Sequence, residues 1–112
     1  MARGYIPKRG DLVWLQFHPQ AGHEQMGRRP AVVLSPESYN RKTSLALFCP
    51  VTSHAKGYPF ETVLPPGIAV RGVALCDQIK SLDWSARHAE FIGELPEEIL
   101  DDILGKALAL LK

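Results

Sequence analysis

Residues 22–36 read GHEQMGRRPAVVLSP, and they join a polar loop to a short apolar strand. The first half is polar and bounded by glycines, which predicts a loop. Residues 30–34 form a short apolar run of the kind typical of a buried strand. Glu24, Arg28 and Arg29 lie where the two halves meet. The stretch is either a surface loop with solvated charges or a site that presents an acid and two guanidinium groups at the mouth of a strand.

Further short segments, separated by Pro and Gly turns, are rich in residues typical of strands. They are residues 12–17, 45–51, 60–64 and 89–93, together with residues 70–75 and 78–82, which form either a strand pair or one strand bent around Asp77. Residues 12–17 are apolar at every position but Gln16. Both faces of this strand are therefore expected to be covered, as in a small barrel or at an interface.

Two segments are expected to be helical. Ser35 and Pro36 fit the N-cap and first position of a short helix over residues 36–40. Residues 95–98, LPEE, open a longer one, with proline and two acids at the favourable end of the helix dipole. Its apolar residues recur at the spacing of an amphipathic helix that packs on the sheet: Ile99, Leu100, Ile103, Leu104, Ala107, Leu108 and Leu111. The fold class is mainly β with helices, as a small β-barrel or strongly bent sheet with a C-terminal amphipathic helix.

The composition describes one ordinary globular domain over residues 1–112. No apolar run is long enough to span a membrane and no secretory signal is visible, so we expect a cytoplasmic protein. Cys49 and Cys76 lack metal-ligand spacing, and we expect free buried thiols with no metal or other cofactor. Residues 1–87 hold eleven Lys/Arg against six Asp/Glu, whereas residues 88–112 hold two against six. A moderately basic body would suit a phosphate-bearing partner.

Four loops carry polar groups suited to single-stranded nucleic acid. They contain, in chain order, Glu24, Arg28 and Arg29; Asn40, Arg41 and Lys42; Thr52, Ser53, His54 and Lys56; and Asp83, Trp84 and Arg87. Guanidinium, ammonium and hydroxyl groups bind phosphate, an amide can read a base edge, and an aromatic ring can stack. Metal-free RNA cleavage could use the same groups. Arg29 suits the phosphorane charge, Thr52 can donate to the same phosphate, and Glu24 or a histidine could act as base.

Three ordered motifs make the chain similar to a known family. They are GRRPAVVLSP at residues 27–36, with EQM before it; TSHAKGYPFE at residues 52–61; and DQIKS at residues 77–81. With residues 10–14, GDLVW, they resemble the MazF/PemK family of toxin endoribonucleases from bacterial toxin–antitoxin modules, nearly end to end. The resemblance implies an SH3-like barrel, a homodimer and a cognate MazE-like antitoxin. It also implies metal-independent, sequence-specific cleavage of single-stranded RNA, which leaves a 2′,3′-cyclic phosphate and a 5′-hydroxyl.

The resemblance also implies roles for single residues. Arg29 corresponds to the catalytic arginine, Thr52 to its phosphate-binding partner and Glu24 to a catalytic or RNA-orienting acid. Arg28 is an electrostatic neighbour within the RNA-binding group. The remaining members of that group, expected to contact RNA or support the site, are Asn40, Lys56, Asp77, Gln78 and Arg87.

A second function class stays open at this point. Related toxins on the same barrel bind and poison a protein target such as DNA gyrase and cleave nothing. The pair formed by Arg29 and Thr52 discriminates between the two classes, because a nuclease needs both residues and a gyrase poison needs neither.

Overall fold

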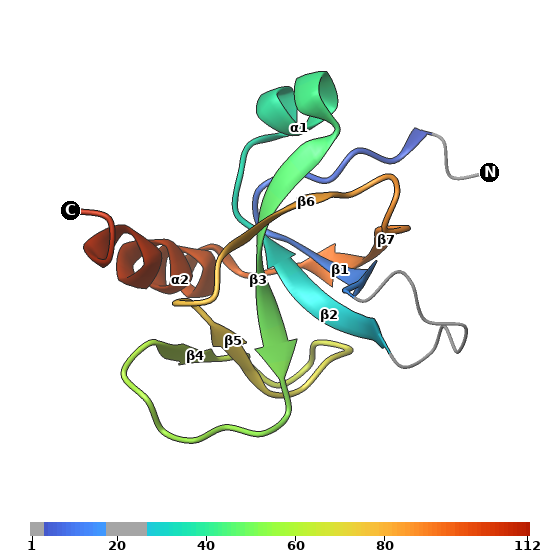
Figure 1. Cartoon of the computed structure of the whole chain (residues 1–112). Helices are drawn as coiled ribbons and strands as arrows, with labels where there is room; N and C mark the ends of the chain where they lie inside the picture. Colours follow the sequence, from blue (N-terminus) through green and yellow to red (C-terminus); the bar gives the residue numbers. More distant parts are fainter. Residues whose placement is uncertain (1–3, 18–26) are drawn as a thin grey trace.

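The computed structural model describes residues 4–17 and 27–112, and its seven strands form one antiparallel sheet (Figure 1). The strands are β1 (Asp11–Gln16), β2 (Arg28–Val33), β3 (Leu45–Thr52), β4 (Glu61–Val63), β5 (Val73–Leu75), β6 (Lys80–Asp83) and β7 (Glu90–Glu94). Each overlaps a segment expected from the sequence. β5 and β6 are two strands that each pair with β3, so they are neither one bent strand nor paired with each other.

The sheet is organised around β3, its longest strand. The strand order is β4-β5-β3-β2-β1-β7, and β6 pairs with β3 off this path. β3 pairs with β6 along its first half and with β5 at its last two residues, while β2 pairs along its middle. The sheet therefore bends sharply around β3. Among the described residues β4 and β7 end the order, so the mainly β, barrel-like expectation is confirmed as an open, strongly bent sheet.

The two faces of the sheet bury two separate cores. Successive strand residues point to opposite faces, so Leu12 of β1 enters one core while Val13 and Leu15 enter the other. The helix-side core includes Leu12, Val32, Cys49, Val51 and Ile103. The loop-side core comprises Val13, Leu15, Ala31, Val33, Ala46 and Phe48. Both faces of β1 are covered, as expected, and this chain's own residues provide the cover, so the apolar pattern of β1 does not itself call for a partner.

The first helix, α1 (Glu37–Thr43), begins one residue later than expected and is longer. Pro36 is its N-cap, and no side chain caps the helix. Ser35 instead donates its hydroxyl to Asn40 Oδ1 at 2.6 Å and accepts the Leu47 N–H at 2.8 Å. The helix continues until Ser44, whose φ of 65° turns the chain into β3. The predicted N-cap at Ser35 is wrong because the Ser35 hydroxyl is engaged by Leu47 of β3, which is distant in the chain.

The second helix, α2 (Glu97–Ala109), covers the helix-side core through Ile103 and Ala107, which are buried. Leu108 and Leu111, expected on its packing face, are 53% and 72% exposed. The C-terminal end of α2 projects beyond the sheet (Figure 1), and Leu111 follows the last residue of the helix. The packing role is therefore confirmed for the middle of the helix and wrong for its end.

A polar cluster fastens α2 to β4. The Thr62 hydroxyl donates to Asp102 Oδ2 at 2.7 Å, and the Lys106 ammonium lies 2.9 Å from the same oxygen. Lys106 Nζ also donates to the Glu61 carbonyl oxygen at 2.8 Å. The hydrogen bond from Thr62 and the adjacent Lys106 ammonium lower the pKa of Asp102. β4 is therefore held from α2 as well as from β5.

Both cysteines are buried free thiols, as the sequence predicts. Burial raises the pKa of Cys49 and of Cys76, because a thiolate loses its hydration in an apolar core. In the part of the chain that the structure describes, no helix has the length and apolar character that a membrane crossing requires.

Candidate functional site

A cleft of about 460 Å³ opens where β2, β3 and β6 meet the segments after β1, β5 and β6. Its walls combine charged or polar side chains with apolar ones. The described residues that line it are Phe17, Arg29, Pro50, Val51, Thr52, Leu75, Gln78, Lys80, Leu82 and Arg87. Arg29, Thr52, Gln78 and Arg87, which the sequence singled out from separate segments, therefore meet in one place.

Arg29 enters the cleft from β2, opposite Leu15 of β1. It lies on the same face of β2 as Ala31 and Val33, whose burial in the loop-side core fixes the strand beneath it. Its side chain is exposed. Within residues 4–17 and 27–112 no hydrogen bond or ion pair engages its guanidinium group. Arg29 is thus a rigidly based cation that is available to a ligand.

Arg28 points to the other face of β2. Its guanidinium pairs with Glu90 and lies 5.7 Å from the centre of the Trp14 ring. It does not line the cleft. Adjacent residues on a strand face opposite ways, so the two arginines cannot act as a pair on one phosphate. The structure therefore does not bring Arg28 to the predicted site.

Arg87 is a fixed wall of the cleft. Its Nη1 donates to the carbonyl oxygen of Phe17 at 2.8 Å and to that of Gln16 at 3.3 Å. The backbone is tied back as well, because the Gln16 N–H donates to the Arg87 carbonyl oxygen at 3.0 Å. Arg87 joins the end of β1 to the segment after β6 and lines the cleft.

Thr52 lies at the last position of β3, and its hydroxyl oxygen accepts the His54 N–H at 3.1 Å. Gly72 approaches the same residue from behind. A Cβ atom at position 72 would stand 2.1 Å from the Thr52 carbonyl oxygen, and Gly72 has a φ of +130°. Only glycine allows this approach and this backbone conformation. The position of Thr52 in the cleft therefore depends on Gly72.

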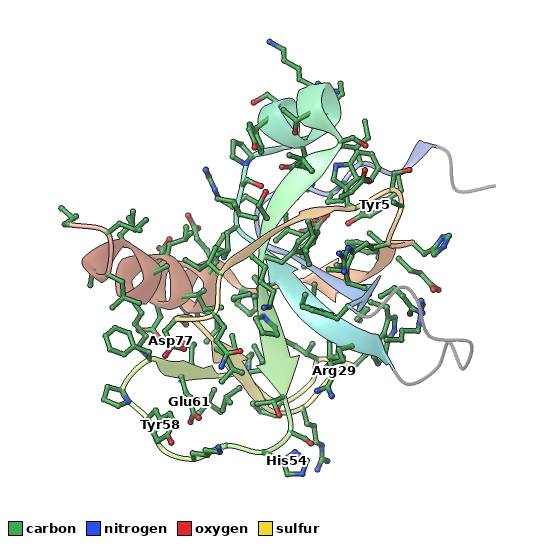
Figure 2. The ribbon with its side chains drawn as sticks, viewed as in Figure 1. Tyr5, Arg29, His54, Tyr58, Glu61 and Asp77 are labelled. Atoms are coloured by element: carbon green, nitrogen blue, oxygen red, sulfur yellow. The ribbon has the colours of Figure 1, made fainter. Side chains whose placement is uncertain are left out.

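Lys56 and Asp77 are exposed and do not line the cleft. Lys56 belongs to residues 53–60, which connect β3 to β4, and Asp77 follows β5. Figure 2 shows Asp77 well apart from Arg29, with β3 between them. Neither residue is placed to share a phosphate with Arg29 in this conformation.

The structure corrects the role predicted for Asn40. Its side chain is fully buried, and its amide nitrogen donates to the carbonyl oxygens of Pro7 at 2.8 Å and Ser35 at 3.1 Å. Its Oδ1 accepts the Ser35 hydroxyl. A side chain with no exposed surface and every polar atom engaged cannot read RNA, so the predicted RNA contact is wrong for Asn40. It joins the N-terminal segment to α1.

Glu24, the remaining predicted catalytic residue, lies outside the described residues, as does most of the loop that carries it. Its role stays a prediction. The described residues contain no group of three or more His, Cys, Asp or Glu side chains that could hold a metal ion.

Lys80 is the cleft residue that the sequence analysis missed. It lies on β6, and Gln78, Lys80 and Leu82 line the cleft as alternate residues. This period of two was visible in the sequence, where Gln78 had already been singled out. Arg29, Lys80 and Arg87 give the lining three cations, and its described residues include no carboxylate. Chemically, the cleft can hold an anion of the size of a phosphate against an apolar wall that suits a base or sugar.

Comparison with known proteins shows which family this chain resembles. A family model described as the PemK-like, MazF-like toxin of the type II toxin–antitoxin system matches residues 8–111. The chain is 50% identical over 111 residues to the endoribonuclease toxin MazF of Escherichia coli K12, covering 99% of both chains. It is 36% identical over 108 residues to the endoribonuclease PemK of Escherichia coli, covering 93% of this chain and 81% of PemK.

Two solved structures from Deinococcus radiodurans share the fold. MazF is 57% identical with a TM-score of 0.87, and the match covers 96% of this chain and 97% of that one. A MazE–MazF complex is 50% identical with a TM-score of 0.85 and covers 96% of both chains.

Proposed function

Because this chain belongs to the family of PemK-like, MazF-like toxins of type II toxin–antitoxin systems, we propose that it cleaves single-stranded RNA at a short sequence in the cleft around Arg29. It is an endoribonuclease, as its curated relatives are. The proposal adds where the RNA binds, which side chains act on it and what products form.

The scissile phosphate would lie between Arg29 and Thr52. Arg29 offers a planar pair of donors to the equatorial oxygens, whose negative charge grows as the phosphorane forms. The Thr52 hydroxyl donates to the same phosphate, while Lys80 and Arg87 hold the neighbouring backbone. These groups stabilise the charge of the transition state and position the strand.

The bond changes are those of an internal transfer. The ribose 2′-oxygen attacks phosphorus as its proton leaves to a base, and the bond from phosphorus to the 5′-oxygen breaks as that oxygen takes up a proton. The products are a 2′,3′-cyclic phosphate and a 5′-hydroxyl, and no metal ion is required. Glu24 is the proposed acid or base, because a carboxylate can take up a proton and a carboxylic acid can release one.

One observation carries the proposal: Arg29 and Thr52, from different strands, line one cleft with two further cations. A toxin that only binds and poisons a protein such as DNA gyrase has no need of this pair. Their meeting therefore favours the nuclease over the binding module.

We further propose that the protein acts in the cytoplasm as a homodimer and is neutralised by a MazE-like antitoxin. A solved relative is a MazE–MazF complex, which supports the antitoxin. Light scattering at micromolar concentration should give twice the mass of one chain, and a monomer would refute the dimer.

The direct test incubates the purified protein with a long unstructured RNA in EDTA. We expect discrete fragments whose 5′ ends carry hydroxyl groups and share a short sequence, read by sequencing those ends. RNA that stays intact would refute the nuclease, and cleavage only after magnesium is restored would refute the metal-independent mechanism.

A further inference from the structure

Residues 53–60, between β3 and β4, contain no helix or strand but are held by hydrogen bonds near both ends. Nearly all of them are exposed, so packing against a core does not hold them. Their order comes from hydrogen bonds at both ends. At the start, the Thr52 hydroxyl oxygen accepts the His54 N–H. The segment therefore begins at a residue that lines the cleft.

Glu61 holds the other end. Its carboxylate accepts the Lys56 N–H on both oxygens, at 3.2 and 3.1 Å, and the Gly57 N–H on one, at 2.9 Å. Hydrogen bonds from backbone N–H groups to a carboxylate are charge-assisted and stronger than neutral ones. Figure 2 shows Glu61 between β4 and the turn that carries Tyr58. Glu61 thus folds the segment back toward its own strand.

This folding brings Lys56 and Tyr58 together at the surface. The Lys56 ammonium lies 5.9 Å from the centre of the Tyr58 ring. The Tyr58 side chain is 57% exposed, although an aromatic side chain on a turn would normally gain free energy by burial. An exposed ring beside a cation is the combination that binds a nucleotide of single-stranded RNA, with the base on the ring and the phosphate at the ammonium.

We propose that Lys56 and Tyr58 form a second nucleotide subsite, on the segment that leads from Thr52 in the cleft to β4, in which an RNA base stacks on the Tyr58 ring. Glu61 is the positioning residue of this subsite. It touches no RNA, but it holds the turn in the shape that binds, so less conformational entropy is lost when RNA docks. The subsite rests on the proposed function, because the cleft must bind the scissile phosphate for a neighbouring nucleotide to reach Tyr58.

The first experiment compares Tyr58→Leu with Tyr58→Phe in steady-state cleavage of a long unstructured RNA. Tyr58→Leu should raise KM about tenfold with little change in kcat, because stacking is lost outside the reacting centre. Tyr58→Phe keeps the ring and should behave as wild type. Tyr39→Leu is the matched control, since Tyr39 is 40% exposed on α1. Equal KM values for Tyr58→Leu and Tyr39→Leu would overturn the subsite.

RNA length gives a second readout. Substrates shortened one nucleotide at a time should lose the difference between wild type and Tyr58→Leu at the length that leaves the subsite empty. A difference that persists down to the shortest cleaved RNA would overturn the proposal, since it would place the effect of Tyr58 inside the cleft.

The positioning role is tested by a double-mutant cycle. Glu61→Ala and Tyr58→Leu should each raise KM, and the double variant should be no worse than the poorer single one, because both remove the same subsite. Glu61→Gln keeps one acceptor oxygen and should recover part of the loss. Additive effects, or a lower melting temperature with unchanged KM, would show that Glu61 is only structural.

The outcomes separate this inference from the proposed function. If the wild-type protein leaves RNA intact, the proposed function fails. If the wild type cleaves but Tyr58→Leu changes only the mass of the dimer or the capture of an antitoxin, Tyr58 belongs to a protein interface and only the subsite is overturned.

Discussion

Two hollows lie in the surface of the described residues, and the smaller one is better suited to RNA. The larger, of about 1240 Å³, lies between Tyr5, Trp84 and Phe91 and is lined by four carboxylates, those of Asp11, Glu37, Glu90 and Glu94. The smaller, of about 460 Å³, is the cleft around Arg29. Volume favours the first and charge favours the second. The larger hollow presents four carboxylates and the smaller one three cations, so the charges favour the smaller hollow for a polyanion.

The two hollows differ also in how their charges are used. In the larger one Lys8 lies 3.3 Å from Glu94, Arg28 pairs with Glu90, and the Tyr5 hydroxyl donates to Asp11 at 2.7 Å. In the cleft, Arg29 has no such partner among the described residues. A charge that is paired within the protein is less available to a ligand, whereas the unpaired charge of Arg29 on β2 remains available. The cleft is thus distinguished by a cation, Arg29, that has no hydrogen bond or ion pair among the described residues.

The largest expected effect is on catalysis. Arg29→Ala should lower kcat by at least ~10²-fold, because it removes stabilisation of the transition-state charge. Arg28→Ala, one residue away on the opposite face, should leave kcat within a few-fold of wild type. Circular dichroism should show both variants folded. Equal losses in the two variants would erase the distinction between the two sides of β2.

The next effect is on the shape of the cleft. Gly72→Ala should destabilise the fold by at least ~1 kcal/mol and lower cleavage, because its Cβ would meet the Thr52 carbonyl oxygen and strain the backbone. Gly67→Ala is the matched control. Gly67 also has a positive φ, of +90°, but no heavy atom lies within 4 Å of a Cβ there. Thermal unfolding with a cleavage assay tests the pair, and equal loss of activity would remove the contact with Thr52 as the cause.

A smaller effect is expected on RNA binding. Lys80→Ala should weaken binding several-fold and reduce the slope of log K against log salt by about 0.7, the value for one phosphate contact on a single strand. Lys42→Ala, an exposed lysine on α1, should change neither quantity. Binding can be measured by fluorescence anisotropy in the Arg29→Ala background, where RNA stays intact. An unchanged slope would remove Lys80 from the phosphate contacts.

The smallest effect belongs to the larger hollow. Glu94→Gln breaks the ion pair with Lys8, but both side chains are more than half exposed, so the pair contributes little. RNA affinity, kcat and melting temperature should all stay close to wild type. A clear loss of RNA binding would mean that the larger hollow takes part after all.

The sequence predicts the fold of this chain well because its main strands are short apolar runs bounded by turns. Residues 12–17 and 45–51 are nearly continuous apolar runs, and such runs become strands when both faces are buried, as Leu12 and Val13 show. The ends of elements were less accurate. Ser35 and Leu108 were misplaced because a hydrogen bond to β3 and the extent of the sheet are decided by tertiary structure.

The site was predictable where spacing along a strand determines direction. Alternation alone separates Arg28 from Arg29 and places Lys80 with Gln78. It could not reveal the burial of Asn40, whose amide reaches the Pro7 carbonyl oxygen across a long separation in sequence. From the sequence alone Asn40 is expected to be exposed, because it lies beside a basic turn and its acceptor, the Pro7 carbonyl oxygen, is distant in the chain.

The hydroxyl of Thr52 has a direction that limits what the cleft can hold. Its oxygen already accepts a hydrogen bond from the His54 N–H, and its own hydrogen remains free to be donated. The cations of the cleft likewise carry hydrogens and no lone pairs. The Thr52 hydroxyl and the cations of the cleft therefore act mainly as hydrogen-bond donors. The cleft therefore suits a ligand with many acceptor atoms, such as a phosphodiester, and is unsuited to amines and other molecules rich in donors.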